Sequence, residues 1–238
     1  MIADPVLTHR AESGYDVPLL VWRLPEPALA ISSAVLGGGI GPCGWLVNAT
    51  VPMSYDRDDP AVHLCEIAGG LGLSAPGVGL LTGVDVADVV ASDDGGVRLW
   101  ATVGLGAPIQ AAADTSTPAP YAGTVNVVAW VPQRLSDGAL VNAVATVTEA
   151  KTQAIRELGL AATGTATDAV AVICPPAGPP ASYAGPRSQW GERLARAVYR
   201  AVLDGGAVNL AGTQSWSDRQ ARRAALSSGA AEAAEKLY

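Results

Sequence analysis

The sequence contains no phenylalanine, two histidines and three cysteines among 238 residues. Without phenylalanine, the core has to be built from Val, Leu, Ala and Ile, with six Trp. Two histidines exclude a multi-histidine metal cluster. An odd number of widely spaced cysteines without a C-x-x-C motif predicts neither a disulfide framework nor a structural zinc site. We therefore expect no metal ion and no cofactor.

Charged residues are also sparse, at 16% of the chain, and the formal net charge is −7. No basic stripe is present, which argues against binding to nucleic acid or to an anionic membrane. Arg219, Arg222 and Arg223 cluster near the end of the chain, where we expect the solvated face of a terminal helix.

The uncharged run 28–55 is long enough to span a bilayer. It is interrupted by Pro42, Asn48, Pro52 and a glycine turn at 37–39, so strands and loops are expected instead. The first fourteen residues lack the basic and apolar regions of a signal peptide. We expect a soluble, cytoplasmic protein.

The remaining composition predicts a single α/β (α+β) domain over 1–238, with a core at 17–205 and a helical tail at 210–238. About seven or eight strands should form a mixed sheet on which helices pack. We predict strands at 19–24, 29–36, 45–51, 84–92, 97–103, 125–131 and 169–174, and a buried strand within 73–83. We predict helices at 60–71, 136–158 and 190–203, and a last helix that Ser217 caps. A Pro25–Pro27 turn should separate the first two strands, and Gly205-Gly206 should end the third helix.

One lysine interrupts the apolar stripe of the helix at 136–158. At about 100° per residue, Lys151 falls about 20° from Leu140 at the centre of the stripe, whereas Glu149 falls on the opposite side. An inward-facing lysine has to find a partner, extend to solvent or lose its proton. We expect it to pair with Asp168 or Glu149.

Two asparagines interrupt apolar strands. Asn48 lies in the run 45–51, and Asn126 shares one strand face with Thr124 and Val128 because side chains alternate. A buried amide has to be hydrogen-bonded. It either ties strands together or offers donors to a ligand, and the sequence leaves both roles open.

The segment 163–168 reads Thr-Gly-Thr-Ala-Thr-Asp and leads into a strand. If it is extended, Thr163, Thr165 and Thr167 face one side and form the wall of a polar pocket. The simpler interpretation is a β-turn with Asp168 as its cap.

Ser32 and Ser33 precede the glycine turn. A serine at such a place is a candidate nucleophile, with a buried lysine as its base. Hydrogen bonding to neighbouring backbone is the simpler interpretation. No helix with Lys-Ser/Thr follows the glycines, so nucleotide-binding fingerprints are absent. Gly38 and Gly39 indicate either a tight turn or a close approach of backbone to a ligand.

Two further residues are weak candidates for catalysis. His63 shares one predicted helix with Cys65, and we expect ordinary packing there, because a catalytic Cys/His pair usually comes from separate segments. Cys43 is a better thiol candidate, but no neighbour in sequence would lower its pKa.

In their order and spacing, several segments resemble the adenosylcobinamide amidohydrolase (CbiZ) family of corrinoid salvage. They are Ile31-Ser32-Ser33-Ala34 with Gly37-Gly38-Gly39, Asn48 with Val51, Gly79-Leu80-Leu81-Thr82, Thr102-Val103-Gly104-Leu105, Gly123-Thr124-Val125-Asn126, Thr148-Glu149-Ala150-Lys151, the run from Thr163 to Ala169, Tyr183-Ala184-Gly185 and the helix 191–202. The chain departs from the family pattern at Gly106-Ala107, where Ser-Asn is common, and at Ala166, where Gly is common.

The resemblance implies hydrolysis of the amide between a corrin side chain and aminopropanol. The substrate would be an adenosylated corrinoid, and the products adenosylcobyric acid and 1-amino-2-propanol. A non-catalytic protein that binds a corrinoid or another small ligand is the alternative. A homo-oligomer is left open.

From chemistry alone, we assign Glu149 or Asp168 to activate a water or hydroxyl, and Lys151 to orient the acid or protonate the amine. Asn48, Asn126 and the backbone of the glycine turn would stabilise the oxyanion. A nucleophilic Ser33 or Thr165 is the alternative. The residues expected to bind substrate are Ser32, Ser33, Gly38, Gly39, Asn48, Thr124, Asn126, Thr163, Thr165 and Thr167.

Overall fold

The computed structural model describes residues 2–114, 123–212 and 215–235. These residues form one mixed eight-stranded sheet and four α-helices, which confirms the predicted fold class. In chain order the elements are β1 (Val6–Glu12), β2 (Tyr15–Ser32), β3 (Gly39–Thr50), α1 (Pro60–Gly70), β4 (Gly77–Thr82), the 3₁₀ turn η1 (Val86–Asp88), β5 (Val90–Asp94), β6 (Val97–Val103), β7 (Val125–Trp130), α2 (Asp137–Glu157), β8 (Ala169–Cys174), α3 (Gln189–Leu210) and α4 (Trp216–Glu235). Within the described ranges, no helix has the length and apolar character needed to cross a membrane.

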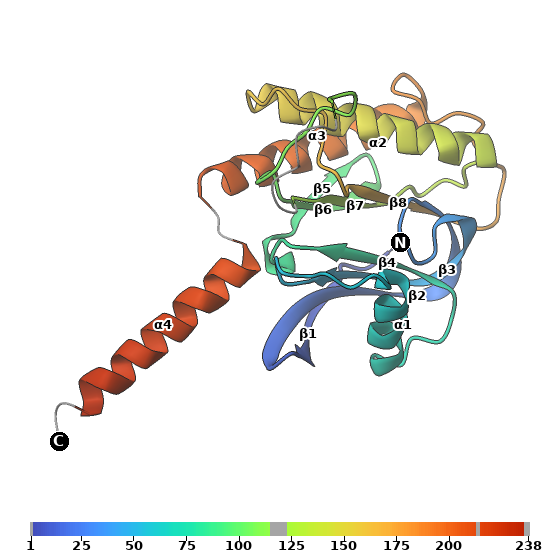
Figure 1. The fold of residues 1–238 in the computed structure, drawn as a ribbon. Helices are drawn as coiled ribbons and strands as arrows, with labels where there is room; N and C mark the ends of the chain where they lie inside the picture. Colours follow the sequence, from blue (N-terminus) through green and yellow to red (C-terminus); the bar gives the residue numbers. More distant parts are fainter. Residues whose placement is uncertain (1, 115–122, 213–214, 236–238) are drawn as a thin grey trace.

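The sheet is folded over on itself. Its strand order is β4-β3-β2-β8-β7-β6-β5, and β1 pairs with β2 off this path. Only the β3–β4 and β7–β8 pairs are parallel among the described strands. In Figure 1 the strands form two stacked layers, β5 to β8 above and β1 to β4 below. We call these layers the upper and lower half-sheets.

A single long strand, β2, connects the two half-sheets. It pairs with β3 along both of its ends, and the register shifts between Arg23 and Ala28. Its last residues, Leu29–Ser32, also pair with β8. The predicted turn at Pro25–Pro27 is therefore wrong: the prolines, which lack an N–H group, lie at an irregularity inside one strand.

The first strand, β1, was not predicted. It pairs antiparallel with β2 through a two-residue turn, in which Ser13 and Gly14 have φ of 51° and 80°. Most of its side chains are exposed or half-buried, so its sequence carries little apolar alternation. Pairing with β2, rather than burial of its own side chains, places it in the sheet.

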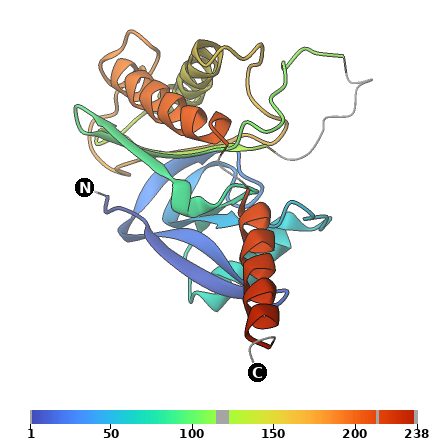
Figure 2. The same ribbon diagram turned by 90° about the vertical axis from the view of Figure 1, so that its left-hand side faces the viewer.

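Three apolar layers hold the molecule together. Helices α2 and α3 cover the outer face of the upper half-sheet, and α1 covers the outer face of the lower one (Figures 1 and 2). Between the half-sheets, Trp22 and Trp100 meet edge to face with ring centroids 5.7 Å apart. The order of layers is helix, sheet, sheet, helix.

Several predicted boundaries need correction. Helix α3 continues through Gly205 and Gly206, because both glycines are buried where α3 packs closely on Val103 and Leu158. The predicted strand at 84–92 divides into η1 and β5, since Asp85 caps the 3₁₀ turn through its bond from the Ala87 N–H.

The helix α4 projects away from the body of the molecule (Figure 1). Ser215, not Ser217, supplies its N-terminal hydrogen bond, because the Ser215 hydroxyl accepts from the Asp218 N–H, whereas Ser217 Oγ accepts from Met53 N–H. Trp216 is buried against Tyr15 and anchors the start of the helix.

Candidate active site

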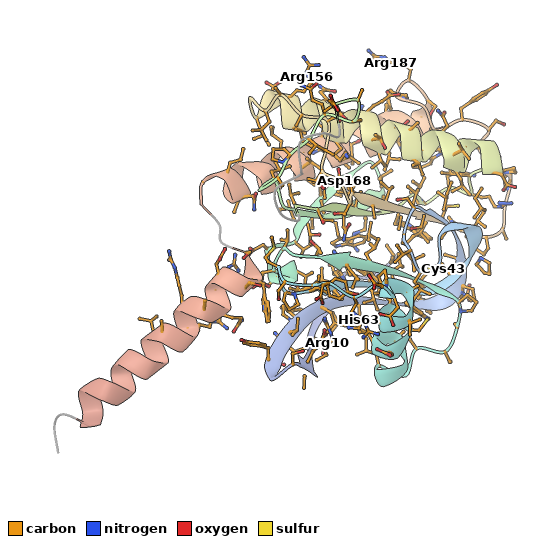
Figure 3. The ribbon with its side chains drawn as sticks, in the orientation of Figure 1. Arg10, Cys43, His63, Arg156, Asp168 and Arg187 are labelled. Carbon is orange, nitrogen blue, oxygen red and sulfur yellow. The ribbon has the colours of Figure 1, made fainter. Side chains whose placement is uncertain are left out.

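Lys151 pairs with Asp168, one of the two partners, Asp168 or Glu149, that the sequence predicts. The apolar face of α2 carries Lys151 toward the sheet, where its side chain is 9% exposed and that of Asp168 is 12% exposed. The Nζ atom donates to Asp168 Oδ2. Figure 3 shows Asp168 between the helical layer and the sheet. Gly164 is required beside this pair, because a Cβ atom there would overlap both Lys151 Nζ and Asp168 Oδ2.

Asp168 accepts four hydrogen bonds. Its Oδ1 accepts from the Val125 N–H at 2.8 Å and from the Thr165 hydroxyl at 2.5 Å. Its Oδ2 accepts from Lys151 and from the Thr165 N–H at 3.0 Å. A carboxylate offers about four acceptor positions in all, so this one is fully occupied. It fixes the start of β7, the segment before β8 and α2 relative to one another.

The three threonines do not share one face. The segment before β8 is a turn, so the simpler interpretation is confirmed and the extended pocket wall is wrong. Thr163 Oγ1 accepts from Ala111 N–H, Thr165 contacts Asp168, and Thr167 Oγ1 lies 2.6 Å from Thr124 Oγ1. The carboxylate of Asp168 bends the chain by accepting the Thr165 N–H three residues earlier.

A cavity of about 490 Å³ opens beside Asp168, between the ends of the half-sheets. We call it the threonine cavity. Its polar lining consists of Ser33, Tyr55, Thr82, Thr124, Thr167 and Asp168. Asp168 is the only carboxylate residue in this lining. The remainder is mostly apolar, from Ala34, Val35, Val51, Pro52, Met53, Pro60, Leu80 and Leu81.

The hydroxyl groups of this cavity differ in whether their protons are left for a ligand. Ser33 Oγ accepts from the Val170 N–H and Thr82 Oγ1 accepts from the Val84 N–H, which leaves each its own proton to donate. Thr167 Oγ1 lies within hydrogen-bond distance of both the Gly123 carbonyl, at 3.2 Å, and Thr124 Oγ1. The Thr124 proton is left for a ligand only when Thr167 donates to Thr124 instead of to that carbonyl.

Asn48 and Asn126 tie the half-sheets together. Asn126 Nδ2 donates to Asn48 Oδ1 at 3.0 Å and to the Leu81 carbonyl at 2.9 Å, and Asn48 Nδ2 donates to Thr102 Oγ1 at 3.1 Å. Both residues are buried, and neither is in the lining of the threonine cavity. Their predicted role as oxyanion donors does not fit this cavity, because both amides lie outside its lining and both amide protons of Asn126 and one of Asn48 already have acceptors in the protein.

The serines before the glycine turn differ from each other. Ser32 is buried; its hydroxyl donates to the Val170 carbonyl and accepts from the Ala34 N–H. Ser33 lines the cavity. Gly38 and Gly39 are outside that lining and form a tight turn, in which Gly39 has φ 89° and a Cβ at Gly38 would lie 2.5 Å from the Ala34 carbonyl oxygen.

Glu149 is exposed on α2, and it is absent from the lining of the threonine cavity. The helix places it away from the face that carries Lys151, as its position in the helical repeat predicts. The structure therefore does not bring Glu149 together with Asp168.

Tyr55 and Thr82 also line the threonine cavity and were not predicted as site residues from the sequence. Tyr55 hydroxyl lies 3.1 Å from His63 Nδ1, and His63 Nε2 lies 3.3 Å from Glu12 Oε1. His63 therefore packs against Tyr55, as expected, rather than against Cys65. Strand β1, which supplies Glu12, had not been predicted, so this contact had no signal in the sequence.

Burial raises the pKa of the Cys43 thiol to about 11, despite its bond to the Trp45 carbonyl. Such a thiol is protonated at neutral pH and is a poor nucleophile. Among the described residues, no cluster of three or more His, Cys, Asp or Glu side chains is placed to hold a metal ion.

Comparison with known proteins gives one family. The model of the family described as adenosylcobinamide amidohydrolase matches residues 4–214. The adenosylcobinamide amidohydrolase of Methanosarcina mazei is 30% identical over 182 residues, which is 73% of this chain and 88% of the relative. That of Halobacterium salinarum is 32% identical over 191 residues, 76% of this chain and 82% of the relative.

Among solved structures, the PH0078 protein of Pyrococcus horikoshii OT3 aligns with a TM-score of 0.42 at 10% identity, over 86% of this chain and 83% of that one. The assignment rests on the sequence matches, which extend over most of the chain and include the residues around the threonine cavity. The chain belongs to the adenosylcobinamide amidohydrolase family.

Proposed function

We propose that this protein hydrolyses the amide that joins aminopropanol to the corrin side chain of adenosylcobinamide. The products would be adenosylcobyric acid and 1-amino-2-propanol. The family match over residues 4–214 carries this proposal. The threonine cavity, with one carboxylate held by a buried lysine at its wall, supplies a site of suitable chemistry.

Amide hydrolysis needs a nucleophile, a base to take its proton, donors for the oxyanion and a proton for the departing amine. The hydrogen bonds that Asp168 already accepts limit which group can be the nucleophile. All four of its acceptor positions are filled, and the one hydroxyl among its donors is that of Thr165. If Asp168 is the base, the proton within its reach is the Thr165 proton.

We therefore assign Thr165 as the nucleophile, Asp168 as its base and Lys151 as the group that orients Asp168. A hydroxyl, a base and a third group that orients the base form the usual arrangement of an activated nucleophile. Thr165 is half-buried and is itself outside the lining of the threonine cavity, but it belongs to the turn whose Thr167 and Asp168 line that cavity. The proposal therefore requires the scissile amide to reach beyond that lining to the Thr165 hydroxyl. The attack would transfer the Thr165 proton to Asp168 as the oxygen bonds to the amide carbon.

Collapse of the tetrahedral intermediate would break the C–N bond, and the amine would leave with the proton held by Asp168. The Thr124 and Ser33 hydroxyls are the donors placed to receive the oxyanion. Water would then hydrolyse the ester on Thr165 and regenerate the hydroxyl. Lys151 would compensate the charge of Asp168 before the proton transfer and again after the amine has left.

The test is release of 1-amino-2-propanol from adenosylcobinamide by the purified protein, with mass spectrometry of the enzyme during turnover. We expect turnover in the wild type, a mass increase equal to the corrinoid acyl group, and loss of both in Thr165→Val. Binding of the corrinoid, seen by visible absorbance, without release of the amine would favour the non-catalytic alternative. Full activity of Thr165→Val would instead assign the attack to water.

A further inference from the structure

A second cavity, of about 680 Å³, adjoins the threonine cavity. Met53 and Gly83 line both of them. It lies where the ends of β6 and η1 meet the last turns of α3, and we call it the glycine cavity. The two cavities are therefore neighbours separated by a shared wall.

The lining of the second cavity lacks side chains at an unusual number of positions. Glycines at 83, 104, 106, 123 and 205 contribute to it. At Gly104, Gly123 and Gly205 an added Cβ would lie 2.6, 2.6 and 2.8 Å from protein atoms, so close packing of the chain itself needs these glycines. At Gly106 an added Cβ would meet no atom of the described residues within 4 Å, so this part of the wall leaves backbone open to a broad, rigid group.

The side-chain amide of one residue in this lining can donate a hydrogen bond to a ligand. Asn209, in the last turn of α3, accepts the Leu105 N–H through Oδ1 at 2.8 Å. This bond fixes the amide so that its Nδ2 group remains a donor. Charged residues in the lining already have partners: Asp88 is paired with Arg219, and Asp218 accepts from the Ser215 hydroxyl.

Resting on the proposed function, we propose that the glycine cavity binds the corrin macrocycle while the threonine cavity takes the aminopropanol arm. The scissile amide links a large ring to a short arm, so a site for it needs a larger compartment beside a smaller one that contains the reacting groups. The cavities of about 680 and 490 Å³ have this order of size, and Asp168 lines the smaller one. The shared residues Met53 and Gly83 mark where the arm passes from one compartment to the other. Methionine, with three rotatable bonds, can adjust to the passage of the arm.

The test fills the glycine cavity from Gly106, which has open space around it and no positive φ. The series is Gly106→Ala, Gly106→Leu and Gly106→Trp, with the exposed Gly69→Leu on α1 as the matched control. Gly69 also has no neighbour within 4 Å of an added Cβ and is outside both cavities. Melting temperature confirms that each variant folds.

We expect KM for adenosylcobinamide to rise with the size of the side chain, by about tenfold for Leu, with kcat within about twofold. Inhibition by adenosylcobyric acid should weaken in parallel, whereas inhibition by 1-amino-2-propanol should not change. Gly69→Leu should match the wild type in both.

The outcomes separate the two proposals. A wild-type protein that releases no amine overturns the proposed function. An active wild type whose KM and product inhibition are unchanged in folded Gly106→Leu and Gly106→Trp overturns the assignment of the macrocycle and leaves the proposed function intact.

Discussion

Two ion-pair clusters, each with residues of both charges, connect helices to neighbouring elements in the upper half of this molecule. They differ in their exposure to solvent. Lys151 on α2 pairs with Asp168 at the wall of the threonine cavity, where both side chains are nearly buried. Asp94 on β5 pairs with Arg196 and Arg200 on α3, where the arginine side chains are 49% and 43% exposed. Solvent screens the second cluster, so it contributes modest stability, whereas loss of one partner in the first leaves a buried charge.

The largest effect is expected from removing the buried cation. Lys151→Met leaves the Asp168 carboxylate without its counter-charge, which should lower the free energy of unfolding by about 3 kcal/mol and abolish amide hydrolysis. Urea denaturation and the amine-release assay measure the two effects.

Arg156→Met is the matched control, because it removes a cation from the exposed face of the same helix (Figure 3). It should change stability by less than about 0.5 kcal/mol. If Lys151→Met were as stable and as active as Arg156→Met, the buried pair would contribute no more than an exposed cation, and its contrast with the exposed cluster would fail.

The next effect concerns the hydroxyls at the cavity wall. Thr124→Val removes a proposed oxyanion donor and replaces threonine by a residue of similar shape. We expect kcat to fall by about 10²-fold. The free energy of unfolding should fall by only about 1 kcal/mol, since one hydrogen bond to Thr167 is lost. Thr148→Val, whose exposed hydroxyl donates to the Val144 carbonyl on α2, controls for loss of a threonine hydroxyl. Equal kcat values in the two variants would remove Thr124 from the oxyanion site.

The exposed cluster should give a smaller effect that depends on pH. Hydrogen bonds from Arg196 lower the pKa of Asp94 to about 2, from an ordinary value of 3.8. A lowered pKa in the folded state stabilises the protein above about pH 4, and this contribution disappears as the pH falls toward 2.

Asp94→Asn should therefore lower stability by about 1 kcal/mol at pH 7, after allowance for solvent screening of the arginines. Activity should be retained. The difference from the wild type should narrow below pH 4 in acid titration followed by circular dichroism; a constant difference down to pH 2 would contradict the ion-pair origin.

The smallest effect is expected at Glu149, which is exposed and outside the threonine cavity. Glu149→Gln should keep kcat within about twofold and leave the melting temperature unchanged. A loss of activity like that expected of Lys151→Met would restore Glu149 as the base and would require another element to cover its face of α2.

Local patterns predicted the elements whose own residues carry the signal. The helical repeat placed Lys151 inward and Glu149 outward, and Ser136 accepts the Ala139 N–H at the start of α2. The β-branched run Ala169–Cys174 formed the predicted strand. Hydrogen bonds and burial within a few turns of helix or residues of strand decide such features.

The site was predicted less completely, because its geometry depends on contacts between distant segments. The sequence offered Asp168 or Glu149 as the partner of Lys151, and either a turn capped by Asp168 or an extended wall for the three threonines. The contacts of the folded chain select Asp168 and the turn, since Asp168 accepts the Thr165 hydroxyl and Thr167 lies against Thr124. From the sequence, Asn48 and Asn126 could equally connect strands or donate hydrogen bonds to a ligand. They connect strands in the structure, because β3 and β7 face each other across the core and the two amides hydrogen-bond.

The sequence by itself determined which side chains of α2 point toward the sheet, Lys151 among them, since these follow from a repeat of 3.6 residues. Only the tertiary structure decided that β2 continues through its prolines, that the sheet folds into two layers, and that two cavities share Met53 and Gly83. These features arise from contacts between residues far apart in the chain. A local sequence repeat does not reveal the free energy of such contacts.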